Sequence, residues 1–427
     1  MKVCIIGAGV VGSYLAKELS KENHEIAVLD KDLGKLEKLK FNYDLLTVNC
    51  SALSLECLEK VKDFDLFIIV TENDEKNIAI SLLLKSILKK EKIIVRVSNE
   101  AFSLKEFKTF LKVETINVFS EVKDVILNLL KYPFALSVVE LEGKILIFKY
   151  SVSLDDFLAG KRISELKDLR DRIDFTIVAI ERENEVILPS GKNFIYPEDN
   201  VYIVTRKENV FNLVKSLKIS FSPIKSVFVL GYSKACLEIL SLLSQQENIK
   251  VKYAFHDKKI CEEISGKFPK FLVLHGDFLD EEFLKEEGIE NSSLVISCGE
   301  SESENILSAT LCKKLGAKKV CSLISRPEYE KLAQSIGIDV PIVPRKLLAS
   351  KVYRTLSKRG ILDVLELSKD LDIVELKVDS SLVGKKVMEI EKPFLIVAIK
   401  RGNEVFLAKG DTELFEGDVI IFVEKKR

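Results

Sequence analysis

The stretch VCIIGAGVVG at residues 3–12 decides how the first part of the chain folds. Its apolar run is typical of a strand that is buried on both faces of a parallel sheet. Three glycines follow in G-x-G-x-x-G spacing, and each has a mechanical role. Gly7 permits a tight turn, Gly9 lets the backbone approach a pyrophosphate, and Gly12 lets a helix pack against the strand. The stretch therefore predicts a strand, a phosphate-binding turn and a helix whose N-terminus faces the ligand.

Strands and helices alternate after this opening unit. The first helix is predicted over residues 12–23, and EIAVLDKD predicts a second strand that ends at Asp30. Further strands are predicted over residues 45–51, 65–74 and 92–98, with helices between them. This alternation is typical of an α/β fold with a doubly wound parallel sheet.

Asp30 is the first candidate ligand contact outside the glycine turn. It follows the glycines by about twenty residues, where a carboxylate accepts hydrogen bonds from ribose hydroxyls. An Asp rather than an Arg at this point favours NAD or another adenosine nucleotide over NADP. The alternative is that the glycines serve only the packing of the helix on the strand.

Two further candidates stand at the carboxyl edge of the predicted sheet, where ligands lie in such folds. The segment VTENDEKN places Thr71 and Asp74 there, although the same residues also suit the start of a helix. Arg96 lies inside a strand, and a cation in that position needs an anionic partner. The partner is either a phosphate or a neighbouring acid.

The chain repeats itself. IVAIERENEVILPSG at residues 177–191 matches IVAIKRGNEVFLAKG at residues 396–410 at most positions and without a gap. Both copies are predicted as hairpins, and Gly402 suits a tight turn with positive φ. Earlier segments match with a similar shift, so a unit of about 215 residues is used twice.

The second copy departs from the predicted nucleotide-binding pattern, and nucleotide binding there is the less favoured alternative. VLGYSKAC keeps Gly231 but has Ser233 and Cys236 where the first copy has glycine. Phe255 aligns with Asp30, and Leu323 aligns with Arg96. Side chains at these positions crowd the approach of a pyrophosphate, so we expect this half to serve assembly or an asymmetric response.

Composition limits the classes of partner and site. Lys and Arg number 65 against 66 Asp and Glu, so the near-zero net charge gives no reason to expect nucleic acid as a partner. The sequence has no long apolar run and no signal peptide, and a cytoplasmic location is expected. The eight Cys and three His show no metal-binding spacing. We expect no metal site, no catalytic residue and no disulfide framework, with the cysteines buried as small apolar residues.

Several segments together carry a resemblance to a known family. They are GAGVVGSYLAKEL and VTENDEKNI in the first copy, and ESENILSATLCKKLGAKKV and LIVAIKRGNEVFLAKG in the second. The chain resembles the TrkA family, the peripheral regulatory subunits of Trk potassium uptake systems, which contain two RCK (KTN) units. The resemblance implies two tandem Rossmann-like domains, each followed by a small α+β RCK_C domain. It places the four domains at residues 1–130, 131–212, 222–350 and 351–427.

The resemblance also implies ligands and partners. The expected ligands are NAD(H), with ATP or ADP as further candidates. The expected assembly is a homotetramer on the inner face of the membrane, docked on a channel-like subunit of the TrkH or KtrB type. Ligand contacts carried over from the family fall on Gly7, Gly9, Val11, Gly12, Asp30, Lys31, Asn49, Thr71, Asp74, Asn77 and Arg96. Cys50 departs from the family pattern, which often has Gly after the Asn.

Two alternative functions remain beside a nucleotide-gated regulator. A cyclic-dinucleotide sensor would use the RCK_C modules, and a segment such as FLIVAIKRGNEVFLAKG is compatible with that use. An NAD-dependent oxidoreductase would need a substrate domain with a general acid or base near the nicotinamide. Residues 131–212 contain no His and are predicted as hairpins, so hydride chemistry is the least favoured alternative.

Overall fold

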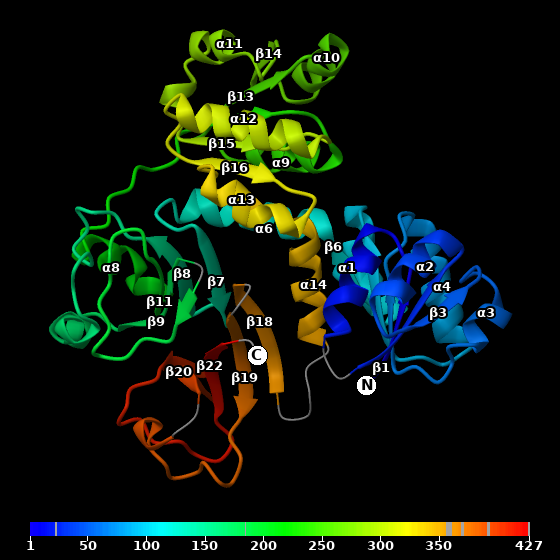
Figure 1. Ribbon diagram of the computed structural model, residues 1–427, viewed down its shortest axis with the longest axis horizontal. Coiled ribbons are helices and arrows are strands. Elements are labelled where there is room, and N and C mark those ends of the chain that lie inside the picture. The colour runs from blue at the N-terminus through cyan, green and yellow to red at the C-terminus, as the bar shows by residue number, and fades with distance from the viewer. Residues whose placement is uncertain (22–23, 184, 356–360, 369–370, 391–392, 426–427) are drawn as a thin grey trace. The chain divides into compact units, whose positions relative to one another are not determined.

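The computed structural model describes residues 1–21, 24–183, 185–355, 361–368, 371–390 and 393–425 (Figure 1). The contacts divide the chain into two compact units. One contains Met1–Val122 with Ser325–Pro327 and Val343–Val352, and the other contains the remaining residues. Within the described ranges, no helix combines the length and the apolar character that crossing a bilayer requires.

The first unit is built on a six-stranded parallel sheet in the order β3-β2-β1-β4-β5-β6. Its strands are β1 Lys2–Ile6, β2 Glu25–Asp30, β3 Leu46–Asn49, β4 Leu66–Ile69, β5 Lys92–Val97 and β6 Glu114–Asn117. Its helices are α1 Val10–Leu19, α2 Leu33–Asn42, α3 Leu55–Glu59, α4 Asp74–Ser86 and α5 Lys105–Leu111, and α6 Val118–Lys131 follows the sheet. Figure 1 shows α1 to α4 lying around these strands, and the predicted doubly wound α/β fold is confirmed.

Local sequence explains most of these elements. The helix α1 begins two residues before the prediction because Gly9, in extended conformation, is its N-cap. Asn73 caps α4 by accepting a hydrogen bond from Lys76 N at 2.7 Å. The prediction missed β6, whose sequence ETIN alternates too little to indicate a strand.

A second parallel sheet repeats this topology in the order β14-β13-β12-β15-β16-β17. Its strands are β12 Ser226–Leu230, β13 Lys250–Phe255, β14 Leu272–His275, β15 Leu294–Ser297, β16 Val320–Leu323 and β17 Val340–Ile342. Its helices are α9 Lys234–Ser244, α10 Lys258–Lys267, α11 Glu281–Glu286, α12 Glu302–Lys314 and α13 Glu330–Ser335, and α14 Pro344–Thr355 follows. The internal repeat is thus confirmed in the strand order.

Each parallel sheet is followed in the chain by a five-stranded antiparallel sheet. The first has the order β10-β9-β11-β8-β7, with β7 Ser137–Leu141, β8 Ile145–Ser151, β9 Phe175–Arg182, β10 Glu185–Ile187 and β11 Asn200–Arg206. The helices α7 Lys167–Arg172 and α8 Val210–Ser216 accompany it. The second has the equivalent order β18-β19-β22-β20-β21, with β18 Ile361–Ser368, β19 Leu371–Lys377, β20 Phe394–Arg401, β21 Glu404–Leu407 and β22 Val419–Lys425.

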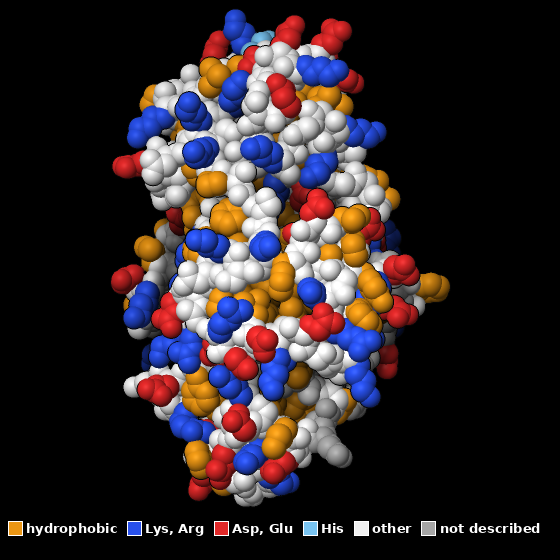
Figure 2. All heavy atoms as spheres, turned by 90° about the vertical axis from the view of Figure 1, so that its left-hand side faces the viewer, with side chains coloured by type: hydrophobic (Ala, Val, Ile, Leu, Met, Phe, Trp, Pro, Cys, Tyr) orange, Lys and Arg blue, Asp and Glu red, His pale blue; other side chains and the backbone are white. Residues whose placement is uncertain are grey.

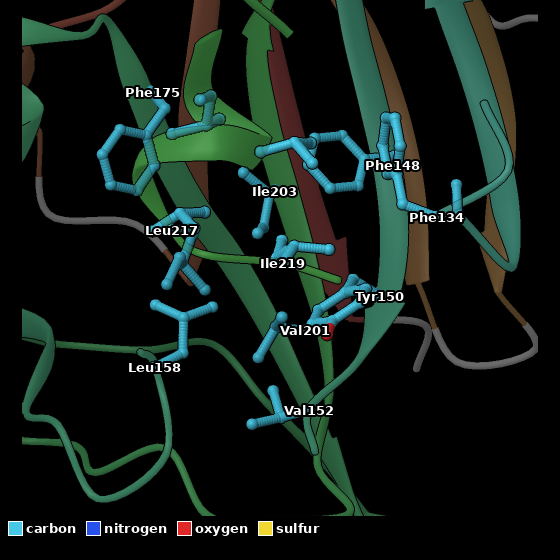
Figure 3. Close-up of a cluster of buried hydrophobic side chains, with 14 of the residues drawn as sticks. Phe134, Phe148, Tyr150, Val152, Leu158, Phe175, Val201, Ile203, Leu217 and Ile219 are labelled. Carbon is cyan, nitrogen blue, oxygen red and sulfur yellow. The ribbon is translucent and has the colours of Figure 1, made fainter. Parts of the chain in front are cut away.

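The first small domain has its own apolar core. Figure 3 shows Phe134, Phe148, Tyr150 and Phe175 among aliphatic side chains that come from β11 and from the segments after β8 and α8. The rings of Phe134 and Phe148 meet edge to face with centroids 5.2 Å apart. This domain therefore folds around a core separate from that of the nucleotide-type sheet.

A second apolar cluster joins the two antiparallel sheets to each other. It combines side chains of both sheets: Leu141, Ile145, Ile147, Val178, Tyr202 and Val204 from the first, and Leu371, Ile373, Val397, Ala398, Ile421 and Val423 from the second. A salt bridge of 2.7 Å between Lys400 and Glu142 stands beside it. The two copies of the small domain thus share one buried interface.

The predicted hairpin turns are present in both small domains. Gly402 has φ of +58°, as the turn requires, and Glu183 takes φ of +48° at the equivalent place. Asn184, in the same turn, lies outside the described residues. The hairpin strands β9–β10 and β20–β21 pair antiparallel on either side of these turns.

The cysteines divide into two groups. Six are buried and free, as expected: Cys4, Cys236, Cys261, Cys298, Cys312 and Cys321. The expectation that no disulfide forms is wrong for one pair, because Cys50 is joined to Cys57. The bond joins the end of β3 to α3. The two cysteines are seven residues apart, so no C-x-x-C pattern indicates the pair.

Candidate functional site

Two residues of the turn at the carboxyl end of β1 must be glycine because a side chain would collide with neighbouring backbone. Gly7 has φ of +111°, and a Cβ there would lie 3.1 Å from the backbone of Val70 and Thr71. A Cβ on Gly12 would lie 1.7 Å from the Gly7 carbonyl oxygen. These two glycines are therefore required by the fold itself, whether or not a ligand binds.

Gly9 is different because no packing demand explains it. A Cβ on this residue would meet only Glu72 Oε1 at 4.0 Å. It stands at the start of α1, whose first turn has no side-chain cap. The next residue, Val10, is 52% exposed, and Val11 is half-buried. The open space before these N–H groups suits an anion.

Asp30 lies beside the glycine turn, at the end of β2. Its carboxylate accepts a hydrogen bond from Ala8 N at 2.5 Å and another from Asp32 N at 2.9 Å. Each carboxylate oxygen has a further lone pair, so the group retains acceptor capacity. Asn49 is exposed on the neighbouring strand and donates to the Asp30 carbonyl at 3.2 Å, and Lys31 is exposed next to it.

Asn77 lies beneath this edge of the sheet and is fully buried. Its Nδ2 donates to the carbonyls of Thr71 at 3.1 Å and Arg96 at 2.9 Å. Its Oδ1 accepts from the backbone and the hydroxyl of Thr71. Asn77 therefore clasps the ends of β4 and β5 together, and direct contact of its side chain with a ligand stays a prediction.

Asp74 has a similar local task. Its Oδ2 accepts hydrogen bonds from Ser98 N and Asn99 N, both at 2.8 Å. The start of α4 is thereby fixed to the end of β5. The carboxylate also places a negative charge close to Arg96.

Arg96 is the cation of this edge. Its Nη1 donates to the Thr71 carbonyl at 3.2 Å, and its buried Nε has no hydrogen-bond partner among the described residues. Burial lowers the pKa of the guanidinium, while Asp74 and Glu72 act in the opposite direction. The side chain thus remains a charged donor with unmet hydrogen-bonding capacity, which suits a phosphate.

The second copy has the same backbone with a closed turn. Gly231 has φ of +92°, and a Cβ there would lie 2.6 Å from Gly299 N. Ser233 Oγ donates to the Cys298 carbonyl at 2.5 Å and caps α9 by accepting from Cys236 N at 3.1 Å. The first turn of α9 therefore already has an internal partner, which α1 lacks.

Aromatic side chains gather where the first copy has its acid. Phe255 pairs with His275 across β13 and β14 as Asp30 pairs with Asn49 across β2 and β3, so the alignment of Phe255 with Asp30 is confirmed. The Phe255 ring centroid lies 5.9 Å from that of Tyr232 and 6.1 Å from that of Phe278. An apolar ring cannot accept a hydrogen bond from a ribose hydroxyl, so this edge lacks the carboxylate acceptor that Asp30 provides in the first copy.

The sequence interpretation missed that the clasp is duplicated. Asn305 donates to the carbonyls of Gly299 at 3.0 Å and Leu323 at 3.1 Å, as Asn77 does to Thr71 and Arg96. The Asn in the matching segments DEKNI and ESENI was the available signal.

The near-zero net charge is distributed over the surface. Figure 2 shows acidic and basic side chains intermixed on the face that it draws, with small apolar areas between them. Within the described ranges, no group of three or more His, Cys, Asp or Glu could hold a metal ion.

Comparisons with known families match both kinds of domain. The TrkA-N domain model matches residues 3–116 and 227–344, and the TrkA-C domain model matches residues 148–217 and 373–426. The Trk system potassium uptake protein TrkA homolog 1 of Methanosarcina mazei is 30% identical over 99% of this chain and 97% of its own length. The Trk system potassium uptake protein TrkA of Vibrio alginolyticus is 29% identical over 100% of this chain and 96% of its own.

Solved structures share the fold. The RCK domain of GsuK superimposes with a TM-score of 0.65 at 16% identity, covering 99% of this chain and 92% of that one. The GsuK channel bound to NAD gives a TM-score of 0.66 at 17% identity, covering 99% of this chain and 76% of that one. The tandem architecture of paired parallel and antiparallel sheets is thus found in a known structural class.

Proposed function

Since the chain belongs to the TrkA family, we propose that it is a nucleotide-binding regulatory subunit that gates a membrane potassium channel-like partner. The observation that carries the proposal is the contrast between Gly9 and the other two glycines of its motif. Gly7 and Gly12 are required by packing, whereas Gly9 leaves open space before an uncapped helix N-terminus. A group that fills this space is an anion such as a pyrophosphate.

The remaining side chains of this edge fit an adenine dinucleotide. The first turn of α1, including Val11, would hold the pyrophosphate, and Asp30 would accept from a ribose hydroxyl. Lys31 and Asn49 lie exposed at the rim, and Arg96 supplies a cation with a free Nε donor. NAD(H) is therefore the proposed ligand, with ADP or ATP competing for the same place.

We propose regulation rather than hydride chemistry. An oxidoreductase would need a general acid or base close to the nicotinamide. His24 lies at the amino end of β2, the edge opposite the glycine turn, and the other two histidines belong to the second copy. Bound nucleotide would therefore act as a signal, and chemistry at its nicotinamide is not part of the proposal.

Gating requires that ligands differ in their contacts with two states of the protein. Thr71, Asp74 and Arg96 hold the ends of β4, α4 and β5 together, and the charges there respond to the phosphates of a nucleotide. Nucleotides with different terminal phosphates would bias this cluster differently. A ligand that bound both states equally would shift nothing, however tightly it bound.

The proposed assembly is the one that the resemblance to the TrkA family implies. We propose a homotetramer at the cytoplasmic face of the membrane, docked on a subunit of the TrkH or KtrB type. We propose domain limits at residues 1–130, 131–212, 222–350 and 351–427. Limited proteolysis with mass spectrometry checks these limits, which should be the first sites of cleavage.

Calorimetry with NADH and ADP tests the site. Gly9→Asp places a carboxylate where the pyrophosphate would lie, and Asp30→Ala removes the ribose acceptor. Both should weaken binding at least tenfold while the Gly9→Asp fold persists, since Asp is favourable at a helix N-cap. Ser233→Asp is the matched control in the second copy and should leave affinity unchanged. Unchanged affinity in both first-copy variants would refute the proposed site.

A further inference from the structure

The disulfide of the first unit joins the rim of the candidate site to the interior of its domain. Cys50 directly follows β3 and is half-buried. Cys57 lies in α3, is 1% exposed and belongs to the apolar core of this sheet. Cys50 is thus partly exposed to solvent, while Cys57 is held in the core.

Two hydrogen bonds connect this disulfide to the glycine turn. Cys50 N donates to the Asp30 carbonyl at 3.0 Å. The carboxylate of the same Asp30 accepts from Ala8 N at 2.5 Å, inside the turn. The position of the loop after β3 is therefore transmitted to the residue proposed to hold the ribose.

The second copy provides an internal comparison. Gly276 occupies the place of Cys50 and makes the same backbone hydrogen bond, to the Phe255 carbonyl at 3.1 Å. Phe283 follows it by seven residues, as Cys57 follows Cys50. A Cβ on Gly276 would lie 2.3 Å from the Phe283 ring, so the ring fills the space between loop and helix. The first copy replaces this ring contact by a covalent bond.

We propose that the Cys50–Cys57 pair is a thiol–disulfide exchange site that sets the nucleotide affinity of the first unit. Its substrate is a dithiol reductant. One thiolate of the reductant attacks Cys50 Sγ, the S–S bond breaks, and Cys57 leaves as a thiolate that takes up a proton. The second thiol of the reductant then attacks the mixed disulfide and releases Cys50. The protein gains two electrons and two protons, and the reductant becomes a disulfide.

Reduction removes the covalent tie between the loop and α3. No ring replaces it as in the second copy, so the two thiols separate and the loop after β3 gains freedom. The ordering of this loop must then accompany ligand binding, which reduces affinity. We expect NADH and ADP to bind about fivefold more weakly to the reduced chain.

The test uses the full chain in both redox states. Mass spectrometry after thiol alkylation reports whether Cys50 and Cys57 are bonded in the air-oxidised protein and free after dithiothreitol. Calorimetry with NADH and ADP then gives the affinity of each form. The matched variant is Cys50→Gly with Cys57→Phe, which introduces the residues found at Gly276 and Phe283 in the second copy. This variant should bind NADH and ADP equally well with and without dithiothreitol.

The possible outcomes are separable, although the affinity readout rests on the proposed function. Free thiols in the oxidised protein, or equal affinity in both forms, would overturn the exchange site. If neither form bound nucleotide, the proposed function would fail. Hydrogen exchange at Cys50 N–H would then still test whether reduction of the disulfide frees the loop after β3. Faster exchange on reduction in the wild type, but not in the matched variant, supports the exchange site, and no change overturns it.

Discussion

The two parallel sheets of this chain have the same strand order and different side chains at their carboxyl edges. Both keep a buried Asn that ties the ends of two neighbouring strands, Asn77 in the first and Asn305 in the second. The first edge carries Asp30 and Arg96, and the second carries Phe255 and Leu323 at the same places. The backbone is thus maintained by apolar strands and by the clasp, and the edge residues can change without changing the topology.

The largest expected difference between the two copies is the loss of stability on substitution of the third glycine of the motif, Gly12. Gly12→Ala puts a Cβ 1.7 Å from the Gly7 carbonyl oxygen, so α1 must move away from β1. We expect a loss of about 3 kcal/mol or more in the stability of the first sheet, and loss of nucleotide binding. Cys236→Ala changes the equivalent residue of the second copy, which already has a Cβ, and should cost about 1 kcal/mol. Hydrogen exchange at β1 and β12 measures both, and equal losses would contradict this account.

The next effect concerns the small domains, where the copies are alike. Arg182 holds Asp199 with two hydrogen bonds of 2.7 Å, and Arg401 holds Asp418 with bonds of 2.9 and 2.8 Å. Asp199 and Asp418 are each 1% exposed as whole residues. Asp199→Asn and Asp418→Asn should each cost about 2 kcal/mol in thermal or urea unfolding. Markedly unequal losses of stability would show that the two Arg–Asp pairs are not equivalent.

The Arg401–Asp418 pair also predicts that the stability of the protein falls at acid pH. Burial by itself raises the pKa of Asp418, but the hydrogen bonds from Arg401 and Phe415 N outweigh it and the pKa is lowered. The stability contributed by a carboxylate with a lowered pKa is present above its unfolded pKa and is lost as the pH falls through the folded value. Asp418→Asn should therefore flatten the loss of stability below about pH 4.

Arg96→Leu copies the second edge into the first and is expected to have a smaller effect. It removes the cation and its unpartnered Nε, and Leu323 shows that an apolar side chain fits this place. Affinity for ADP should fall about tenfold, equivalent to about 1.4 kcal/mol, with little change in the melting temperature. Leu323→Met is the control and should leave binding unaltered. Calorimetry at two salt concentrations provides the measurement, and an undiminished affinity would remove Arg96 from the site.

The smallest expected effect is a pH dependence of stability that Lys319 contributes and that Lys92, at the same position in the first copy, does not. Lys319 immediately precedes β16, and its Nζ donates to the carbonyls of Pro133 at 2.6 Å and Ala135 at 2.9 Å. Its counterpart Lys92 is exposed. Burial lowers the pKa of Lys319 to about 8, with Lys313 acting in the same direction and Asp339 against it. Between pH 8 and the unfolded pKa the unfolded state binds more protons, so stability rises with pH.

The measurement is the pH dependence of unfolding. The wild type should gain about 1 kcal/mol over this range, a value discounted for the partial exposure of the amine. Lys319→Met should abolish the gain and Lys92→Met should preserve it. A gain that survives Lys319→Met must come from another group.

Much of the fold was predictable because strands and helices have different apolar periods. The runs that became β1, β2, β4 and β5 were recognised from their apolar residues, and the repeat showed that the topology occurs twice. The strand β6 was missed because its four residues carry no clear period. Asp30 and the glycines were found from spacing, since a short local motif sets their geometry.

The sequence by itself determined the order of the elements, the duplication and the types of residue at the carboxyl edge of each parallel sheet, since all three are expressed in local patterns. Only the tertiary structure decided which of these residues are free. It showed that Asn77 and Asp74 are occupied by backbone partners, that Gly9 is the one glycine of the G-x-G-x-x-G motif that faces open space, and that Cys50 is bonded to Cys57. The physical reason is that a side chain's partners come from strands and helices brought together by folding, and spacing along the chain does not report them.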